Sequence, residues 1–485
     1  MTSYYIDPSG PNGSGSQGSP YNSFASVPSL VAGDNVFFKC GTTHTGQILY
    51  NSSRGASTTL ASPITFGKYG TGANPIIASN DWCVDVDARN GVIVQDLQTQ
   101  PVNSFSSGGV RILNSAQCTV QRMTTSARCD YGIRIDNTGA SALGTINVLN
   151  NTILGTYGNT CILVVYGSSI GGVFEDVTIS GNVLGNAGAY ATDGTPYGIR
   201  TISRTTPVTT SSGTVDLDLF SRGVRINDNT ITSNPAYGIA AAHISTGGTE
   251  TLTNQICRNF LTDIGDGAHD SHMLWVAGCR NVDVVSNILD GSIMFQGSTF
   301  GTGVGIFVDA AGFGNEFDGA RGIRVIRNLV QNTGQQSAGS AGTLEVAGAG
   351  LLAFLSQTVQ FIDNETRNCH NGLGVLGWFG TGLKTQTVTA RGNRLYNSTR
   401  AGISNIKASD AVTMQENFVD GYGTAGIYVE NAGAYAVTSY TETRNGVSGL
   451  AATAYMGGSE PTSTETPSAT RTPSAGNLVL STQYY

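Results

Sequence analysis

The chain has 485 residues, of which only 12% are charged, and 33 Asp and Glu against 25 Lys and Arg give a net charge of −8. This acidic balance, without a Lys/Arg cluster, excludes a typical nucleic-acid binder. The apolar runs are too short to span a bilayer, so we expect no membrane insertion. With 65 glycines the composition favours short strands and many turns over long helices.

The chain begins Met1-Thr2-Ser3-Tyr4-Tyr5, without the charged and apolar regions of a signal peptide, so none is expected. The composition predicts a Gly/Ser-rich lead-in and a cap over residues 1–30, a repetitive domain over 31–440 and a Ser/Thr/Pro-rich tail over 441–485. Two interpretations of the tail stay open: pairing with a neighbouring subunit, and a frayed terminus. The eight cysteines lack CxxC spacing, which predicts buried free thiols and neither a disulfide framework nor a zinc site.

An Asn-centred unit recurs along the chain, with apolar residues on both sides of the Asn. Its copies are centred on Asn151, Asn182, Asn229, Asn259, Asn287, Asn328, Asn364, Asn393 and Asn417. The average step is about 33 residues, within the range of solenoids. Asn tolerates left-handed backbone and can hydrogen-bond the Asn of the next coil. We therefore expect an internal Asn ladder at a tight bend.

Roughly eight residues after many of these Asn comes a Gly followed by a strand of period two, as in Tyr197-Gly198-Ile199 and Tyr237-Gly238-Ile239. Short strands with one buried face, repeated once per unit, predict an all-β fold: a right-handed, single-stranded parallel β-helix of roughly 11–13 coils with an N-terminal cap.

Two segments carry a family resemblance. Residues 4–39, from Tyr4-Tyr5-Ile6-Asp7-Pro8 to Asn35-Val36-Phe37-Phe38-Lys39, and residues 62–77 resemble right-handed parallel β-helix proteins of the pectin-lyase-like superfamily. That group includes polysaccharide lyases and phage tailspike depolymerases, and the pattern extends over roughly residues 4–440. The resemblance implies a polysaccharide substrate and a homotrimer.

Equivalent positions of a solenoid stack about 5 Å apart, so the alignment of the Gly-led strands predicts which side chains are neighbours. Two places after the glycine lie Arg134, Arg200, Ala240, His269 and Phe307, and four places after it lie Asp136, Ile202, Ala242, Ser271 and Asp309. Five places after it lie His243, His272 and Ala310, which predicts that these three are neighbours. The alignment predicts that one face holds His243, His269, Asp270, His272 and Asp309, with Arg200 one coil before.

Two cleavage chemistries fit these residues. Hydrolysis needs two carboxyl groups, for which Asp270 and Asp309 are candidates with Asp266 in reserve. Elimination from a uronate needs a base and a group that neutralises the carboxylate, and His272 or His243 with Arg200 would fit. The Lys/Arg pair typical of alginate-lyase relatives is not visible, because Lys39 and Lys68 lie in early coils.

Substrate binding is predicted for Arg200, His269, Arg134, Trp275 and Phe307. No metal is expected, because a spacing of three on a strand places His269 and His272 on opposite faces. We expect no cofactor, although a structural or catalytic Ca²⁺ stays open. Two alternatives also stay open: a plain turn at Asp266-Gly267, and a solvated surface for the whole group.

Taken together, the sequence predicts a tailspike-like depolymerase that cleaves a bacterial surface glycan, located on a virion tail or outside the cell. The alternatives are a secreted polysaccharide lyase and a non-catalytic tail fibre or adhesin that binds glycans.

Overall fold

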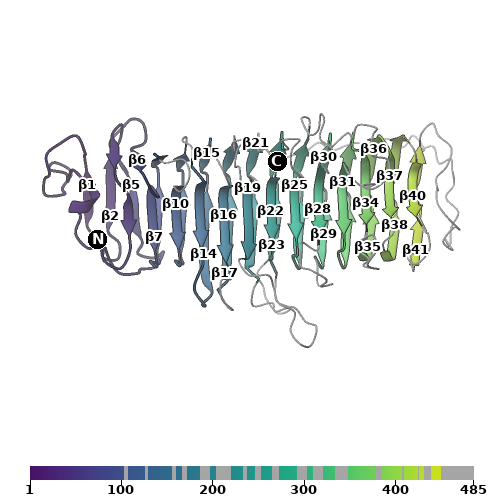
Figure 1. Cartoon of the computed structure of the whole chain (residues 1–485), viewed down its shortest axis with the longest axis horizontal. Coiled ribbons are helices and arrows are strands. Elements are labelled where there is room, and N and C mark those ends of the chain that lie inside the picture. The colour runs from purple at the N-terminus through teal and green to yellow at the C-terminus, as the bar shows by residue number, and fades with distance from the viewer. Residues whose placement is uncertain are drawn as a thin grey trace.

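The structure is a computed structural model, and it describes residues 1–102, 108–125, 129–155, 160–166, 172–185, 197–203, 220–232, 237–245, 253–264, 272–291, 303–309, 320–333, 348–376, 385–406, 409–423, 425–430 and 439–448. The chain winds into a long solenoid with the N-terminus at one end (Figure 1). Each coil contributes one strand to each of three sheets, and every paired strand in these sheets is parallel to its neighbours. The expected right-handed parallel β-helix is confirmed, with 13 complete coils.

The three sheets are named in the order in which a coil visits them. The first sheet has 15 strands: β1 (Ser3–Ile6), β2 (Asn35–Lys39), β5 (Ile64–Tyr69), β8 (Val92–Gln95), β11 (Cys118–Gln121), β14 (Leu143–Leu149), β17 (Phe174–Ser180), β20 (Arg222–Asn227), β23 (Asn254–Cys257), β26 (Val282–Val285), β29 (Ile323–Ile326), β32 (Val359–Ile362), β35 (Thr385–Arg391), β38 (Ser409–Gln415) and β41 (Ser439–Thr443). The second sheet has 14 strands: β3 (Thr43–Thr45), β6 (Ile76–Ser79), β9 (Gln98–Pro101), β12 (Thr124–Thr125), β15 (Thr152–Leu154), β18 (Val183–Gly185), β21 (Thr230–Thr232), β24 (Phe260–Thr262), β27 (Ile288–Asp290), β30 (Leu329–Gln331), β33 (Glu365–Arg367), β36 (Arg394–Ser398), β39 (Phe418–Tyr422) and β42 (Gly446–Ser448). The third sheet has 13 strands: β4 (Ile48–Tyr50), β7 (Val84–Asp87), β10 (Gly108–Leu113), β13 (Tyr131–Asp136), β16 (Thr160–Tyr166), β19 (Tyr197–Ser203), β22 (Tyr237–Ala242), β25 (His272–Ala277), β28 (Val304–Asp309), β31 (Ala349–Phe354), β34 (Asn371–Leu376), β37 (Ala401–Ile406) and β40 (Ala425–Glu430).

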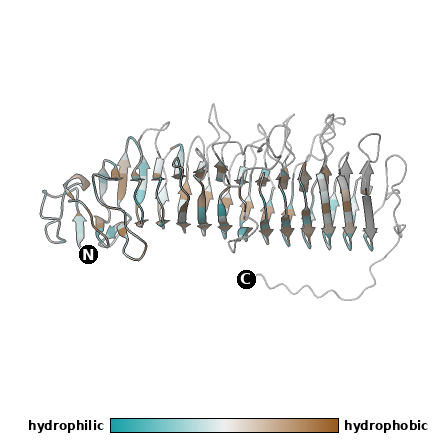
Figure 2. Ribbon diagram, turned by 90° about the horizontal axis from the view of Figure 1, so that it is seen from below, coloured by the Kyte–Doolittle hydropathy of each residue, from teal (hydrophilic) through white to brown (hydrophobic). Residues whose placement is uncertain are grey.

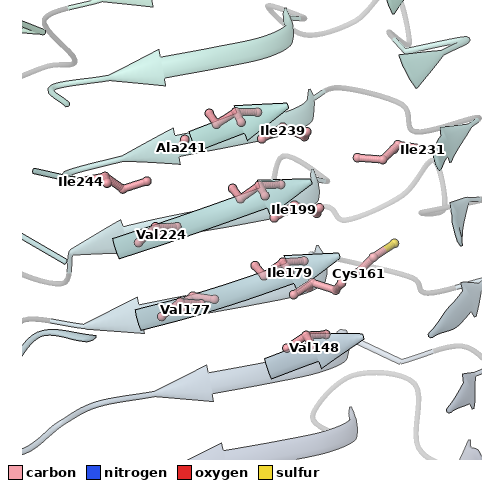
Figure 3. Close-up of a cluster of buried hydrophobic side chains, with 14 of the residues drawn as sticks. Val148, Cys161, Val177, Ile179, Ile199, Val224, Ile231, Ile239, Ala241 and Ile244 are labelled. Atoms are coloured by element: carbon pink, nitrogen blue, oxygen red, sulfur yellow. The ribbon is translucent and has the colours of Figure 1, made fainter. Parts of the chain in front are cut away.

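The core runs through the middle of the solenoid, because alternate residues of each strand point inward. Hydrophobic and hydrophilic residues therefore share the same strands (Figure 2). Val148, Ile179 and Ile226 stack in the first sheet, and Ile199 and Ile239 stack in the third; all five are buried. Figure 3 shows such side chains from successive coils gathered between the sheets. Each coil thus completes its core by stacking on its neighbours.

The Asn ladder is present, and it extends one coil further than predicted. It lies at the bend between the first and second sheets and runs from Asn151 to Asn445. The amide Nδ2 of each Asn donates to Oδ1 of the next at 2.8–3.0 Å. The left-handed residue, however, is the one before each ladder Asn, such as Asp228 (φ 58°) and Arg258 (φ 54°). Because the preceding residue adopts the left-handed backbone conformation, the Asn itself does not have to, and its side chain points into the core.

The Gly-led strands of the third sheet are confirmed, and the contacts of the glycines explain them. A Cβ on Gly132 would lie 2.5 Å from Cγ2 of Ile153, a core residue of the second sheet. A Cβ on Gly238 would lie 2.5 Å from Cδ2 of Leu261 and from the Met273 carbonyl oxygen. The glycines therefore let the third sheet approach the second closely.

Replacing Gly238 by Ala is expected to lower the free energy of unfolding by about 1–3 kcal/mol, because the added methyl group overpacks the core. Gly10→Ala is the matched control, since a Cβ there meets nothing within 4 Å. Chemical denaturation followed by circular dichroism measures both variants. Equal stability of Gly238→Ala and the parent would contradict the packing argument.

The two ends of the described chain differ from the middle. At the N-terminus, Phe24 of the 3-10 turn η1 (Phe24–Ser26), Val27 and Leu30 are buried and belong to the hydrophobic core cluster. At the other end, β41 and β42 carry the solenoid to residue 448, past the predicted boundary at 440. Residues 449–485, which hold most of the predicted tail, lie outside the described residues.

All eight cysteines are free and buried, as predicted. Burial raises the pKa of the Cys118 thiol to about 12 and that of Cys279 to about 12. These thiols stay protonated at pH 8 and are inaccessible to reagents in solution.

We expect the native protein to react negligibly with a thiol-titrating disulfide at pH 8, and the denatured protein to show all eight thiols. Rapid reaction of the native protein would contradict this packing.

Candidate functional site

The outward-pointing residues of the third sheet between β10 and β31, called the outer face below, form three rows along the solenoid axis. The strand register defines each row. The row at the strand starts holds Tyr131, Thr160, Tyr197, Tyr237, His272 and Val304. The middle row holds Arg111, Arg134, Leu163, Arg200, Ala240, Trp275, Phe307 and Leu352, and the row at the strand ends includes Asp136, Val165, Ala277, Asp309 and Phe354.

Aromatic rings of five consecutive coils contact one another on the outer face. Tyr197 stacks on Tyr237 with centroids 4.9 Å apart, and Tyr237 stacks on Trp275 at 5.5 Å. His272 lies between Tyr237 and Phe307, at centroid distances of 5.3 and 4.5 Å. Phe307 in turn stacks on Phe354 at 6.2 Å. We call the run from Tyr197 to Phe354 the aromatic stack; coil stacking produces it, because equivalent side chains lie one strand spacing apart.

Arginines of the middle row occupy the N-terminal half of the outer face. Arg111 forms a bidentate ion pair with Asp85, at 2.8 and 2.6 Å. Arg134 binds Asp136 on its own strand, with Nε donating at 2.6 Å. Arg134 and Arg200 also lie over tyrosine rings, 4.9 Å from the centroid of Tyr131 and 4.4 Å from that of Tyr197 respectively. The outer face is therefore charged at one end and aromatic at the other.

Asp309 is the carboxyl group that lies against the aromatic stack. It ends β28 and is 9% exposed. The indole Nε1 of Trp275 donates a hydrogen bond to Oδ2 of Asp309 at 3.3 Å. Trp275, one coil earlier in the middle row, thus contacts the carboxylate as well as the rings of Tyr237 and His272.

The predicted alignment is wrong for the coil that contains β25. The position equivalent to Gly238 and Gly305 is occupied by Met273, so the coil has no leading Gly. The middle-row residue is therefore Trp275, where the alignment placed His269, and Ala277 replaces Ser271. Asp266, His269 and Asp270 lie outside the described residues.

The alignment is also wrong for His243, which does not lie beside His272. His272 starts its strand in the row of Tyr237, whereas His243 follows the end of β22 with left-handed backbone (φ 58°). The His243 ring is buried, and its Nδ1 accepts a hydrogen bond from the Ser203 amide at 3.3 Å. Burial lowers the pKa of this imidazole to about 4, and the positive charge of Arg200 adds to the lowering. His243 is thus a neutral residue of the bend.

The remaining predicted residues are on the outer face. Arg200 lies one coil before Ala240, as predicted, but the alignment omitted the coil of β16, which places Leu163 between Arg134 and Arg200. Asp136 and Asp309 are five coils apart, about 24 Å at the usual strand spacing. Glycosidase carboxyl pairs are about 5–10 Å apart, so these two do not form such a pair.

Sequence reasoning missed several members of the outer face. Tyr131, Tyr197 and Tyr237 each precede the Gly of a Tyr-Gly-Ile triplet, a signal that could have placed them in one row. Asp130, directly before β13, was also not among the predicted residues; burial raises the pKa of its carboxyl, against the opposing charge of Arg134. Within the described ranges, no group of three or more His, Cys, Asp or Glu could hold a metal ion. Those ranges also contain no helix long and apolar enough to cross a membrane.

Comparison with proteins of known structure identifies the fold. No protein-family model matches the chain, and no curated protein matches it. A mannuronic acid specific polysaccharide family 6 lyase from human gut microbiota is similar in structure, with a TM-score of 0.50 and 12% identity over 86% of this chain and 87% of the lyase. PfbA, a surface adhesin of Streptococcus pneumoniae, also gives 0.50, with 12% identity over 83% of this chain and 86% of the adhesin. At these identities the likeness concerns the fold: the chain is a right-handed parallel β-helix protein, as its sequence resemblance implied.

Proposed function

We propose that the protein binds and cleaves a polysaccharide along the outer face. The observation that carries this proposal is the aromatic stack, which continues over five coils and has a carboxyl group, Asp309, against it. Aromatic rings suit the apolar faces of sugar rings, while carboxyl and guanidinium groups suit hydroxyl groups and charges. A row that repeats once per coil offers equivalent contacts to successive units of a polymer.

For the reaction, we propose hydrolysis with Asp309 as the proton donor to the glycosidic oxygen. A second carboxyl group must then act as base or nucleophile, and Asp270 and Asp266, a few residues before β25, are the candidates. The alternative, β-elimination, would use His272 as base, which lies within the aromatic stack. We propose no cofactor for either reaction. The biological setting we propose is a tailspike-like depolymerase of a bacterial surface glycan, acting as a homotrimer on a virion tail or outside the cell.

The test is incubation with a panel of capsular and uronic-acid polysaccharides. New reducing ends without ultraviolet absorbance would indicate hydrolysis, whereas new absorbance from an unsaturated uronate would indicate elimination. If the protein neither binds nor cleaves any polysaccharide of the panel, this result contradicts the proposal.

A second candidate function is a non-catalytic glycan-binding adhesin. The observation that favours it is that Asp136 on the outer face and Asp85 on the preceding strand β7 are held in ion pairs with Arg134 and Arg111 respectively. Such carboxylates can accept hydrogen bonds from sugar hydroxyl groups but are poorly placed to transfer protons. Binding without any cleavage product in the same panel would favour this function.

A further inference from the structure

We infer that Arg200 makes the outer face selective for anionic glycans, by binding a carboxylate of a uronic-acid unit next to the aromatic stack. This inference rests on the proposed function, and it concerns which polysaccharide the face accepts.

Arg200 differs from the two other arginines of the middle row in its partners. Arg111 and Arg134 are each neutralised by an aspartate, Asp85 and Asp136. Among the residues that the structure describes, Arg200 has no carboxylate partner, and its guanidinium lies over the ring of Tyr197, 4.4 Å from the centroid. No aspartate or glutamate of the described ranges therefore compensates its charge.

The surroundings of Arg200 strengthen the effect of this charge. Its row neighbours on the adjacent coils are Leu163 and Ala240, both apolar and buried. Tyr197, beneath the guanidinium, is itself 6% exposed. Arg200 remains partly exposed, so a ligand can reach it. A guanidinium held against a ring and flanked by apolar side chains gains more from an anion than one in open water does.

The chemistry of the guanidinium points to a carboxylate. Arginine presents a rigid fork of N–H donors that matches the two oxygens of a carboxylate. The stacked rings of Tyr197, Tyr237 and Trp275 begin directly beside it. A sugar unit over the rings would place a carboxylate on the same or the next unit within reach of Arg200. A neutral polysaccharide would leave the guanidinium without an anion.

The test compares polygalacturonate, alginate and hyaluronan with the same preparations after reduction of their carboxyl groups. We expect the parent protein to bind at least one acidic polymer about 10–100-fold more tightly than the same polymer with reduced carboxyl groups, the range for a charge-assisted hydrogen bond.

Arg200→Gln should remove this difference and leave binding of the reduced polymer unchanged. Arg200→Lys should retain part of it, since Lys keeps the charge but not the fork. Arg324→Gln, which removes an arginine paired with Asp283 on the first sheet, is the matched control and should behave as the parent.

The outcomes separate the inference from the proposed function. Equal binding of acidic and reduced polymers by the parent would overturn the role of Arg200 and leave glycan binding intact. An equal loss for both forms in Arg200→Gln would also overturn it, because the residue would then act by packing alone. Failure of every polymer to bind the parent would instead defeat the proposed function.

Discussion

Replacing Asn287 by Ala is expected to lower the free energy of unfolding by about 3–5 kcal/mol, the largest stability effect that we predict for a single ladder residue. The Nδ2 of Asn287 donates to the Ile256 carbonyl and to Oδ1 of Asn328, both at 2.9 Å. Its Oδ1 accepts from the backbone amide and the Nδ2 of Asn259. The substitution leaves these buried groups without partners and opens a space in the core.

Urea denaturation followed by circular dichroism measures this loss, and amide hydrogen exchange shows whether it is confined to the coils that contain Asn259, Asn287 and Asn328. We expect it to be local at first, because a coil contacts mainly its neighbours. Asn147→Ala is the control: this Asn lies on the first sheet, is partly buried, and makes one weak bond to Thr119 at 3.4 Å. Equal stability of the two variants would show that the ladder adds nothing beyond ordinary surface bonds.

The ladder also shows why the fold could be predicted from the sequence. Its Asn residues recur at a spacing that needs no knowledge of tertiary structure, and the glycines before Ile199 and Ile239 recur with them. Both features are imposed by local geometry, a bend and a close sheet contact; the Asn repeats in each coil of the ladder, and the Gly in most of them. The left-handed residue was assigned to the wrong position because Asn has a well-known tendency for that backbone. In the structure, Asp228, Arg258 and Ser286 adopt it in front of the Asn.

The outer face could be predicted only in part, because its rows depend on the alignment of every coil. Arg200, Phe307 and Asp309 were placed correctly, since Gly198 and Gly305 lead their strands. The coil of β25 has Met273 at that position, and the nearest upstream Gly-led segment, at Gly267, shifted the prediction by six residues. The coil of β16 has Cys161 there and was passed over altogether. A single non-Gly residue at the leading position thus changes which side chains are predicted to be neighbours.

Replacing Asp309 by Asn is expected to reduce polysaccharide cleavage by a factor of about 10²–10⁴, the usual contribution of a general acid, while binding persists. The Asn keeps the shape of the side chain and an oxygen that can accept from Trp275 Nε1, so the loss would report on proton transfer rather than packing. Trp275→Phe keeps a ring next to Tyr237 but removes this donor, and a smaller loss is expected because the carboxylate is then less well oriented. Asp283→Asn on the first sheet is the matched control and should retain full activity.

Release of reducing ends at saturating substrate measures the activity of each variant. Because Asp270→Asn is expected to have an effect as large as that of Asp309→Asn, full activity in both would remove the outer face as the site of hydrolysis, whereas loss in one alone would identify the carboxyl group that transfers the proton.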